Sequence, residues 1–380
     1  MNLVMISLDT LRADVAYSGR FPSIERLRAR GCSFMTTVSS SPLTPISHAT
    51  IFTGLQPPNH GIRHLLKEQM NPAARTLTEV MAEAGYNTGA VVSCPGMNRW
   101  YGLSRGFAHY DDWIPPLADG RDALQVIDVE LRGTALKRAP LVVERALEWA
   151  RRAGPGPKLL FAHFFDAHWP YESPEEPPPG TANPYEGEVW YMDRYLGLLL
   201  DGLAELGMTD ENTTFVLFSD HGEDLAGWYE NDHSGELGHP EEKGHGCLLF
   251  DATQLVPLVV CAPGVTTPGS QVAEQVRLVD VAPTVLELMG RDGLECDGRS
   301  LVPLLRGEPM PHAPAYCEAF YREELASMNQ RWAHLLPLKG IRNPGEKVVW
   351  EVGGERVESY DMLQDPCERN PLVLVDGQPR

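Results

Sequence analysis

Carboxylates and imidazoles follow three short apolar runs of the sequence, at the point where each run ends. Asp9 follows NLVMISL, and Asp166 and then His168 follow KLLFAHFF. Asp220 and His221 follow TTFVLFS. If these runs are parallel strands of one sheet, their carboxyl ends lie at the same edge, where open sheets bind ligands. Acidic and imidazole groups that converge there would repel or desolvate one another without a cation, so the spacing predicts a metal site.

Each of these groups taken alone has a simpler interpretation. An Asp after a strand is often only the N-cap of the next helix, and Asp-His-Gly can be an ordinary turn. A polar, His-rich loop over residues 222–247 adds Lys243 and His245 in KGHG, just before another strand-like run. The joint pattern of strand ends and loop is much less expected by chance than any one element, which favours the metal site.

Thr44 lies in a stretch that begins like a helix, SSSPLTPISHATIFTG over residues 39–54. Thr is a favoured N-cap, Pro45 suits the first helical position, and Gly54 suits the residue past the helix end. The stretch therefore predicts a helix capped by Thr44. Because a helix N-terminus carries unpaired N–H groups and the positive end of the helix dipole, it also suits a phosphate or sulfate group.

The apolar runs alternate with amphipathic stretches, and this alternation indicates the fold. Further strand-like runs are NTGAVVS and VPLVVCA. Helical patterns are FPSIERLRARG, RTLTEVMAEAG, APLVVERALEWARRAG and EVWYMDRYLGLLLDGLAELG. Strands that are apolar on both faces and alternate with helices predict an α/β fold with a mostly parallel central sheet sandwiched by helices.

The pattern changes near residue 310, where shorter segments begin. The segment EKVVWEVGGERVESYD has a Gly-Gly pair between two alternating runs and predicts a hairpin. We therefore expect a catalytic domain over residues 1–310. We expect a small C-terminal α+β subdomain, built on an antiparallel sheet and packed on that domain, over residues 311–380.

Composition and charge limit the partners of the chain. Its 380 residues include 52 acidic and 32 basic ones, a formal net charge of −20, which disfavours nucleic acid and anionic membranes. The seven cysteines form no CxxC pair, so neither a disulfide framework nor a zinc ribbon is indicated. The opening apolar run is too short for a signal peptide, and we expect a cytoplasmic protein. The sequence leaves a homo-oligomer open.

A set of motifs occurs in one order along the chain. They are LVMISLDTLRAD, FPSIERLRARGCSF, SPLTPISHATIFTGLQPPNHGIR, FFDAHWPY, FSDHGE, KGHG, LVDVAPTVLELMG, DGRSLVPLLRG and ESYDMLQDPCERNP. As an ordered set over residues 2–371 they resemble the sulfatase branch of the alkaline phosphatase superfamily. The resemblance implies an alkaline phosphatase-like fold. It also implies one divalent metal, shared by the strand-end groups and the helix start: Asp9, Thr44, Asp220 and His221.

The resemblance places Thr44 at the position of the family's nucleophile. Sulfatases have Cys or Ser there, in a Cys/Ser-x-Pro-x-Arg motif that matures to formylglycine. This chain departs from the motif, with Ile46 in place of the Pro and His48 in place of the Arg. Oxidation of Thr44 would give a ketone, so formylglycine is not expected. Family members with an unmodified Thr are typically phosphodiesterases, phosphonate hydrolases or phosphoryl transferases.

The ligand set indicates the metal. His221 adds an imidazole to oxygen ligands, which favours Zn²⁺ or Mn²⁺ over Ca²⁺. The second Asp that sulfatases carry after the first strand is Thr10 here, which also argues against calcium. His168 and His245 are expected to contact or protonate the ester beside one firm metal; the alternative is a second metal site built from them and Asp166. Arg12 and His48 are expected to contact the substrate or to support the residues that do, and Lys243 is a further expected substrate contact.

These observations predict hydrolysis of phosphate or phosphonate esters, through attack by Thr44 and a phosphothreonine intermediate that water then hydrolyses. The first alternative is sulfate ester hydrolysis at the same site, and the second is phosphoryl transfer or mutase chemistry with an alcohol as acceptor. A binding protein with a degenerate site is the alternative outside enzymes, and the retained nucleophile and ligands argue against it. The substrate in every enzymatic case is a small anionic ester.

Overall fold

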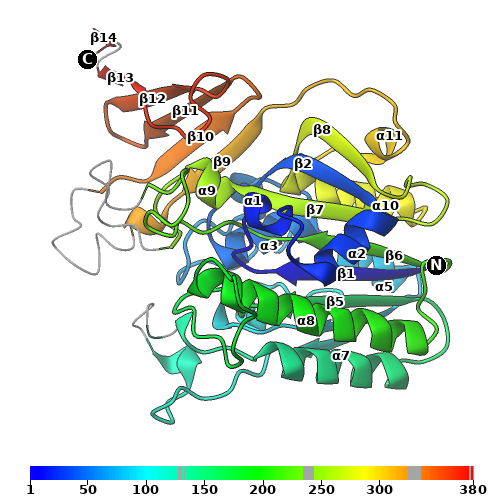
Figure 1. Cartoon of the computed structure of the whole chain (residues 1–380). Coiled ribbons are helices and arrows are strands. Elements are labelled where there is room, and N and C mark those ends of the chain that lie inside the picture. The colour runs from blue at the N-terminus through cyan, green and yellow to red at the C-terminus, as the bar shows by residue number, and fades with distance from the viewer. Residues whose placement is uncertain (127–130, 132, 234–243, 324–334, 376–377, 380) are drawn as a thin grey trace.

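The computed structural model describes the chain except residues 127–130, 132, 234–243, 324–334, 376–377 and 380 (Figure 1). Within the described residues, the central sheet has eight strands. From one edge to the other they are β4 (His109–Asp111), β3 (Asn87–Val91), β5 (Lys158–Phe164), β1 (Asn2–Leu8), β6 (Thr213–Phe218), β7 (Leu255–Cys261), β2 (Cys32–Val38) and β8 (Ser270–Arg277).

Neighbouring strands run parallel except at β7, which is antiparallel to both β6 and β2. The chain passes from β6 to β7 without a long covering helix, so it returns into the sheet from the edge at which β6 ended, and β7 runs antiparallel. The described parts of this connection, residues 219–233 and 244–254, therefore lie at the carboxyl edge of β1, β5 and β6. The predicted α/β fold with a mostly parallel central sheet is confirmed.

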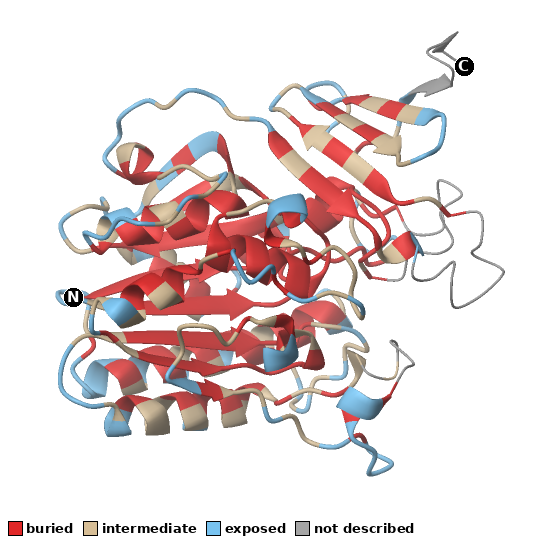
Figure 2. Ribbon diagram, turned by 180° about the vertical axis from the view of Figure 1, so that it is seen from behind, coloured by how far each residue is buried: buried red, intermediate tan, exposed pale blue. Residues whose placement is uncertain are grey.

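Helices cover both faces of the sheet because the central strands bury side chains on both. Along β1, Leu3 and Met5 belong to one buried cluster, whereas Val4 and Ile6 belong to the other. One face is covered by α1 (Ala13–Ala16), α2 (Pro22–Arg30), α7 (Ala139–Arg152) and α8 (Pro184–Glu205). The other is covered by α3 (Thr44–Thr53), α5 (Leu77–Glu83), α10 (Val281–Leu288) and α11 (Val302–Leu305). Figure 2 shows the central strands buried and the exposed residues gathered on loops and outer helix surfaces.

Short elements complete this part of the chain. They are α4 (Pro57–His60), α9 (Asp251–Gln254), η1 (Pro95–Met97), η2 (Arg99–Tyr101), η3 (Ala123–Gln125) and η4 (Leu278–Asp280). Of these, α4 and η4 pack beside α3, and α9 leads directly into β7. The helix predicted around Thr44 is thus α3, and neighbouring helices bury it against the sheet.

A second, antiparallel sheet occupies the C-terminal part of the chain. Its order within the described residues is β14 (Gln378–Pro379), β13 (Leu372–Val375), β12 (Arg356–Asp361), β11 (Glu346–Glu351), β10 (Leu338–Arg342) and β9 (Ala315–Ala319). The predicted Gly-Gly hairpin is confirmed, because β11 and β12 pair with Trp350 opposite Val357. The division of the chain at residue 310 stays a prediction.

A buried ionic cluster joins this second sheet to the segment that leads into β7. The carboxylate of Asp251, at the start of α9, accepts from Arg342 at 2.7 Å and from Lys347 at 3.0 Å. Lys347 also pairs with Glu368 at 2.7 Å, and these side chains are buried. Because an unpaired buried charge is costly, the cluster stabilises one position of the C-terminal sheet against the central sheet.

We expect Lys347→Met to lower the free energy of unfolding by about 3–5 kcal/mol, the usual cost of removing one partner from a buried ion pair. The reason is that the carboxylates of Asp251 and Glu368 lose the ammonium group between them. Denaturant unfolding followed by circular dichroism measures the effect. Lys339→Met, at a half-buried position of β10, is the control and should change stability by about 0.5 kcal/mol or less. Equal effects of the two variants would contradict the assigned role of the cluster.

Candidate active site

Thr44 is the first residue of α3, with Leu43 as the N-cap and Gly54 in the left-handed region at φ 65° past the helix end. The sequence-based assignment of Thr44 as the N-cap is therefore wrong by one position, and no side-chain cap bond forms. Its hydroxyl faces the strand ends instead. Oγ1 lies 3.2 Å from Oδ2 of Asp9 and 3.3 Å from Nε2 of His221. The hydroxyl is thus available for chemistry rather than for capping.

Asp9, Asp220 and His221 lie together at the ends of β1 and β6. Ligand atoms of all three are within 4.8 Å of one another, and the three side chains are buried. The Nδ1 of His221 is 3.0 Å from the carbonyl oxygen of Gly222, which can only accept, so Nδ1 carries the proton. The lone pair of Nε2 consequently faces Thr44 and also Oδ2 of Asp220, at 3.4 Å.

These groups fit a divalent cation. Nε2 of His221 and Oδ2 of Asp220 are two acceptors that face each other, an unfavourable contact unless a cation lies between them. Oδ1 of Asp9 and Oδ2 of Asp220 are buried without hydrogen-bond partners. Among the ion pairs of the described residues, these two carboxylates meet only histidines. Burial, followed by the charge of Asp220, raises the pKa of Asp9 well above its usual value.

His48 supports the start of α3. Its Nδ1 donates to the carbonyl oxygen of Thr44 at 2.8 Å, and its Nε2 accepts from Oγ of Ser7 at 2.9 Å. Both ring nitrogens are therefore occupied, and burial lowers the pKa of His48 to about 3. Of the two roles expected for His48, this geometry favours support of the site by a neutral imidazole.

The guanidinium of Arg12 is also fully used within the protein, which favours the supporting role expected for it over a substrate contact. Nε and Nη2 donate to the carboxylate of Asp14 at 3.0 and 2.8 Å. Nη1 donates to Asp232 at 2.6 Å and to the carbonyl oxygen of Glu223 at 2.7 Å, and Nη2 also donates to Asn231. All five N–H donors of the side chain have partners. Arg12 thus fastens the loop that follows β6.

His168 and His245 lie beside the metal-type ligands, as the sequence predicted. The ring of His245 is 4.2 Å from that of His221 and 4.9 Å from that of His168, measured between centroids. Nδ1 of His245 lies 3.2 Å from a carboxylate oxygen of Glu223. Burial lowers the pKa of His168 to about 3 and of His245 to about 4, whereas burial raises the pKa of Glu223 to about 7. Their roles stay predictions.

Asp166 does not join the two histidines. Its Oδ1 accepts from the backbone N–H of Ala139 at 3.1 Å, at the start of α7, and lies 3.7 Å from Arg138. In the β1–β5 register Leu8 lies beside Phe164, so continuing it puts Phe165 beside Asp9 and turns Asp166 to the opposite face. No close ligand group among the described residues contains Asp166 with His168 and His245. The alternative second metal site is therefore not supported, and Lys243 lies outside the described residues.

Two residues near Asp9 were missed by the sequence analysis. Nε2 of His163, inside β5, is 3.0 Å from Oδ2 of Asp9, and Cys94 follows β3 close by. Ser7 pairs directly with His163 in the β1–β5 register, on the face that α3 covers. A signal was present, because Ser7 and His163 are polar residues inside otherwise apolar runs. The strand-end pattern considers only the residues that follow each strand, so it misses polar side chains within the strands.

The comparisons with known proteins agree with this fold. The sulfatase family model matches residues 1–291, so the chain belongs to the sulfatase family. It is 31% identical to human arylsulfatase D over 266 residues and 32% identical to rat (Rattus norvegicus) steryl-sulfatase over 274 residues. These matches cover 64% and 63% of this chain but 44% and 45% of the relatives, so the chain matches less than half of their length.

Solved structures extend the likeness of the fold. The phosphonate monoester hydrolase of Agrobacterium radiobacter has a TM-score of 0.75 at 19% identity, over 98% of this chain and 91% of that one. A structure solved with D-glucosamine-2-N,6-O-disulfate as substrate has a TM-score of 0.73 at 17% identity, over 98% and 93%. The family places the chain in the alkaline phosphatase superfamily. Among the described helices, none combines the length and the apolar character that a membrane span requires.

The comparisons correct the main functional prediction. We expected a phosphate or phosphonate ester hydrolase because Thr44 occupies the position of the family's Cys or Ser. The family model and the curated relatives named above are sulfatases, and they favour the alternative of sulfate ester chemistry. The single difference at Thr44 was therefore not enough to predict a different ester, because the remaining motifs are those of sulfatases.

We expect a chelator to lower the thermal unfolding temperature of the metal-loaded protein by several degrees. An ion at a thousand times its dissociation constant stabilises the fold by about 4 kcal/mol, and its removal leaves Asp9 and Asp220 unpaired. Asp220→Asn should reduce the shift, because a charged ligand becomes neutral. Asp111→Asn is the control, since Asp111 pairs with Lys137 and Arg145 and should keep the full shift. An unchanged melting temperature of the wild type would contradict the metal site.

Proposed function

We propose that the chain hydrolyses sulfate esters at the site around Thr44. The observation that carries the proposal is the buried set of Asp9, Asp220 and His221 facing the Thr44 hydroxyl, in a chain that belongs to the sulfatase family. The curated arylsulfatase and steryl-sulfatase relatives support the same chemistry. The proposed substrate is a small anionic sulfate ester.

A divalent ion held by Asp9, Asp220, His221 and Thr44 would polarise the hydroxyl and neutralise charge on the sulfate oxygens. The imidazole of His221 favours Zn²⁺ or Mn²⁺ over Ca²⁺ in this role. The start of α3 adds the positive end of the helix dipole beside Thr44. Pro45 offers no N–H, so it stiffens the start of the helix rather than binding the anion.

In the first step the Thr44 oxygen attacks sulfur. Its proton leaves to solvent, while a new S–O bond forms and the S–O bond to the leaving alcohol breaks. Water then attacks the sulfur of the threonine sulfate and breaks its bond to Thr44. The Thr44 oxygen takes a proton from the attacking water, and hydrogensulfate leaves. The native hydroxyl serves here because Thr cannot become the aldehyde of the family's modified nucleophile.

His245 and His168 are proposed to donate to the leaving alcohol or to the ester oxygens. Nδ1 of His168 donates to the carbonyl oxygen of Trp169 at 2.9 Å, so Nε2 must gain a proton before it can donate. The low pKa values of both imidazoles keep them neutral in the free protein near neutral pH. An anionic ester beside them favours the charged form, so substrate binding raises those pKa values and supplies the donor.

We also propose a cytoplasmic location, which the cysteines support. None of the seven cysteines forms a disulfide; Cys32, Cys94, Cys247, Cys261 and Cys317 are buried, and Cys296 and Cys367 are half-buried. Free thiols are the usual state in compartments that keep cysteines reduced. Localisation of a tagged full-length chain tests this assignment.

The ester preference tests the proposed function. We expect p-nitrophenyl sulfate to have a higher kcat/KM than p-nitrophenyl phosphate and bis-p-nitrophenyl phosphate. Thr44→Ala should lower sulfate turnover by about a thousandfold or more, because the nucleophile and a metal ligand are lost together. Thr44→Ser should keep measurable turnover, since a hydroxyl survives. Thr53→Ala, at the other end of α3, is the control and should stay within about twofold.

Acid quenching during turnover should trap a sulfate adduct on the peptide that contains residues 39–54. Intact-mass analysis should show the same peptide unmodified in the resting protein. A higher kcat/KM for either phosphate ester would refute the proposed function. Full activity of Thr44→Ala would show instead that water attacks sulfur directly, and it would remove Thr44 from the mechanism.

A further inference from the structure

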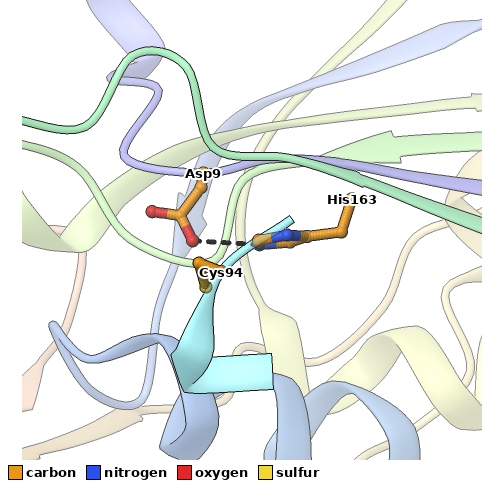
Figure 3. A group of neighbouring side chains, drawn as sticks. All are labelled: Asp9, Cys94 and His163. Atoms are coloured by element: carbon orange, nitrogen blue, oxygen red, sulfur yellow. Dashed lines mark hydrogen bonds and ion pairs between the residues drawn. The ribbon is translucent and has the colours of Figure 1, made fainter. Parts of the chain in front are cut away.

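Asp9 also belongs to a second group of potential metal ligands, on the opposite side of β1 from Asp220 and His221. Within the described residues, ligand atoms of Asp9, Cys94 and His163 also lie within 4.8 Å of one another. Figure 3 shows the Cys94 sulfur beneath the line that joins the carboxylate and the imidazole. Asp9 follows β1, Cys94 follows β3 and His163 lies in β5, so adjacent strands hold the group rigidly.

The spacing of these atoms is close to that of a tetrahedral zinc site. Oδ2 of Asp9 is 3.0 Å from Nε2 of His163. Zinc bound at about 2.0 Å to nitrogen and about 2.1 Å to oxygen would separate the two atoms by about 3.3 Å, so a small side-chain shift suffices. All three side chains are at least 98% buried, with relative exposures of 0%, 2% and 0%.

His163 has the outer hydrogen bond that orients metal-binding histidines. The backbone N–H of Ser93 donates to its Nδ1 at 3.3 Å and Oγ of Ser93 lies 2.8 Å away, so in the metal-free protein Nε2 carries the ring proton and donates to Oδ2 of Asp9 at 3.0 Å. A zinc ion at Nε2 takes the place of this proton, which moves to Nδ1 and is donated to Oγ of Ser93. The second carboxylate oxygen of Asp9 is buried without a hydrogen-bond partner, so one carboxylate can serve two ions.

We infer that Asp9, Cys94 and His163 form a second metal site, selective for Zn²⁺, that shares Asp9 with the site around Thr44. Thiolate and imidazole ligands favour Zn²⁺ and disfavour Mg²⁺, Ca²⁺ and Mn²⁺. Catalytic zinc ions usually have three protein ligands and keep a fourth coordination position open. The inference concerns metal binding and does not rest on the ester that is hydrolysed.

Zinc binding at this site releases a proton. Burial and the neighbouring carboxylate of Asp9 raise the pKa of the Cys94 thiol, so the metal-free protein holds S–H. When zinc binds, the S–H bond breaks, the proton leaves to solvent and the sulfur lone pair binds the ion. Three anionic ligands, Asp9, Asp220 and Cys94, then face two divalent ions and leave a net positive charge, which attracts an anionic ester.

The second site also lies near the nucleophile. A Cβ atom at Gly96 would be 3.4 Å from Cβ of Thr44 and 3.5 Å from Sγ of Cys94, so both side chains flank the same point. Zinc at Cys94 therefore adds positive charge on the side of Thr44 that faces the segment after β3. This position complements the ion held by Asp220 and His221.

Metal stoichiometry and cobalt spectroscopy on the full chain test the inference. After removal of metal and reloading, the wild type should hold two equivalents of Zn²⁺ and Cys94→Ser one. Replacement by Co²⁺ should give a near-ultraviolet thiolate-to-cobalt band in the wild type and not in Cys94→Ser. Cys317→Ser, at a buried thiol in β9, is the matched control and should keep both equivalents and the band. Asp220→Asn should weaken the other ion and keep the band.

His163→Asn provides a second variant, with folding checked by circular dichroism in case Cys94→Ser does not fold. It should also lose one zinc equivalent, and its cobalt band should shift or disappear, because the imidazole is lost while the thiol remains. One equivalent of zinc and no thiolate band in the wild type would overturn the inference. A band that persists unchanged in Cys94→Ser would overturn it as well, since another cysteine would then bind the cobalt.

Discussion

Two buried carboxylates and an imidazole lone pair converge at the ends of two adjacent strands, and the whole site depends on compensating their repulsion. Asp9 follows β1 and Asp220 follows β6, and these strands pair in parallel. Their side chains are fully buried, and among the described residues their ion pairs are with imidazoles alone. Such an arrangement is unfavourable in an apolar interior unless a cation is bound. The repulsion between these buried groups therefore lies at the point where chemistry is expected.

Neutral groups around these ligands set their orientation. His48 bridges Ser7 and the carbonyl oxygen of Thr44, and His221 is fixed by the carbonyl oxygen of Gly222. Each ring uses one nitrogen on a carbonyl oxygen, which determines what the other nitrogen can do. Because burial lowers the pKa of His48, that ring adds no charge to the site. The positions of the reactive groups are thus fixed before any ligand arrives, which is how a site lowers its reorganisation cost.

The sequence predicted the edge of the sheet but not the direction of each side chain. The strand-end pattern placed Asp9, Asp220 and His221 together, since that depends only on which strands are parallel. It failed for Asp166, because one residue of register decides which face a side chain takes. It also missed His163, whose relevance comes from pairing with a strand far away in sequence. The motifs identified the family correctly, whereas the reaction was misjudged from the single position of Thr44.

The ion pairs that hold the loop after β6 have a consequence for the order of folding. Arg12, near the N-terminus, fastens this loop through Asp232, and the end of the same connection is fixed through Asp251 to Lys347 and Glu368. The centre is therefore assembled from contacts of very long sequence separation, which form slowly. During synthesis, the ribosome must release residues up to 368 before both ends of the connection can be fixed. Until then the central sheet can fold, but the connection that carries Asp220 and His221 is anchored at one end only.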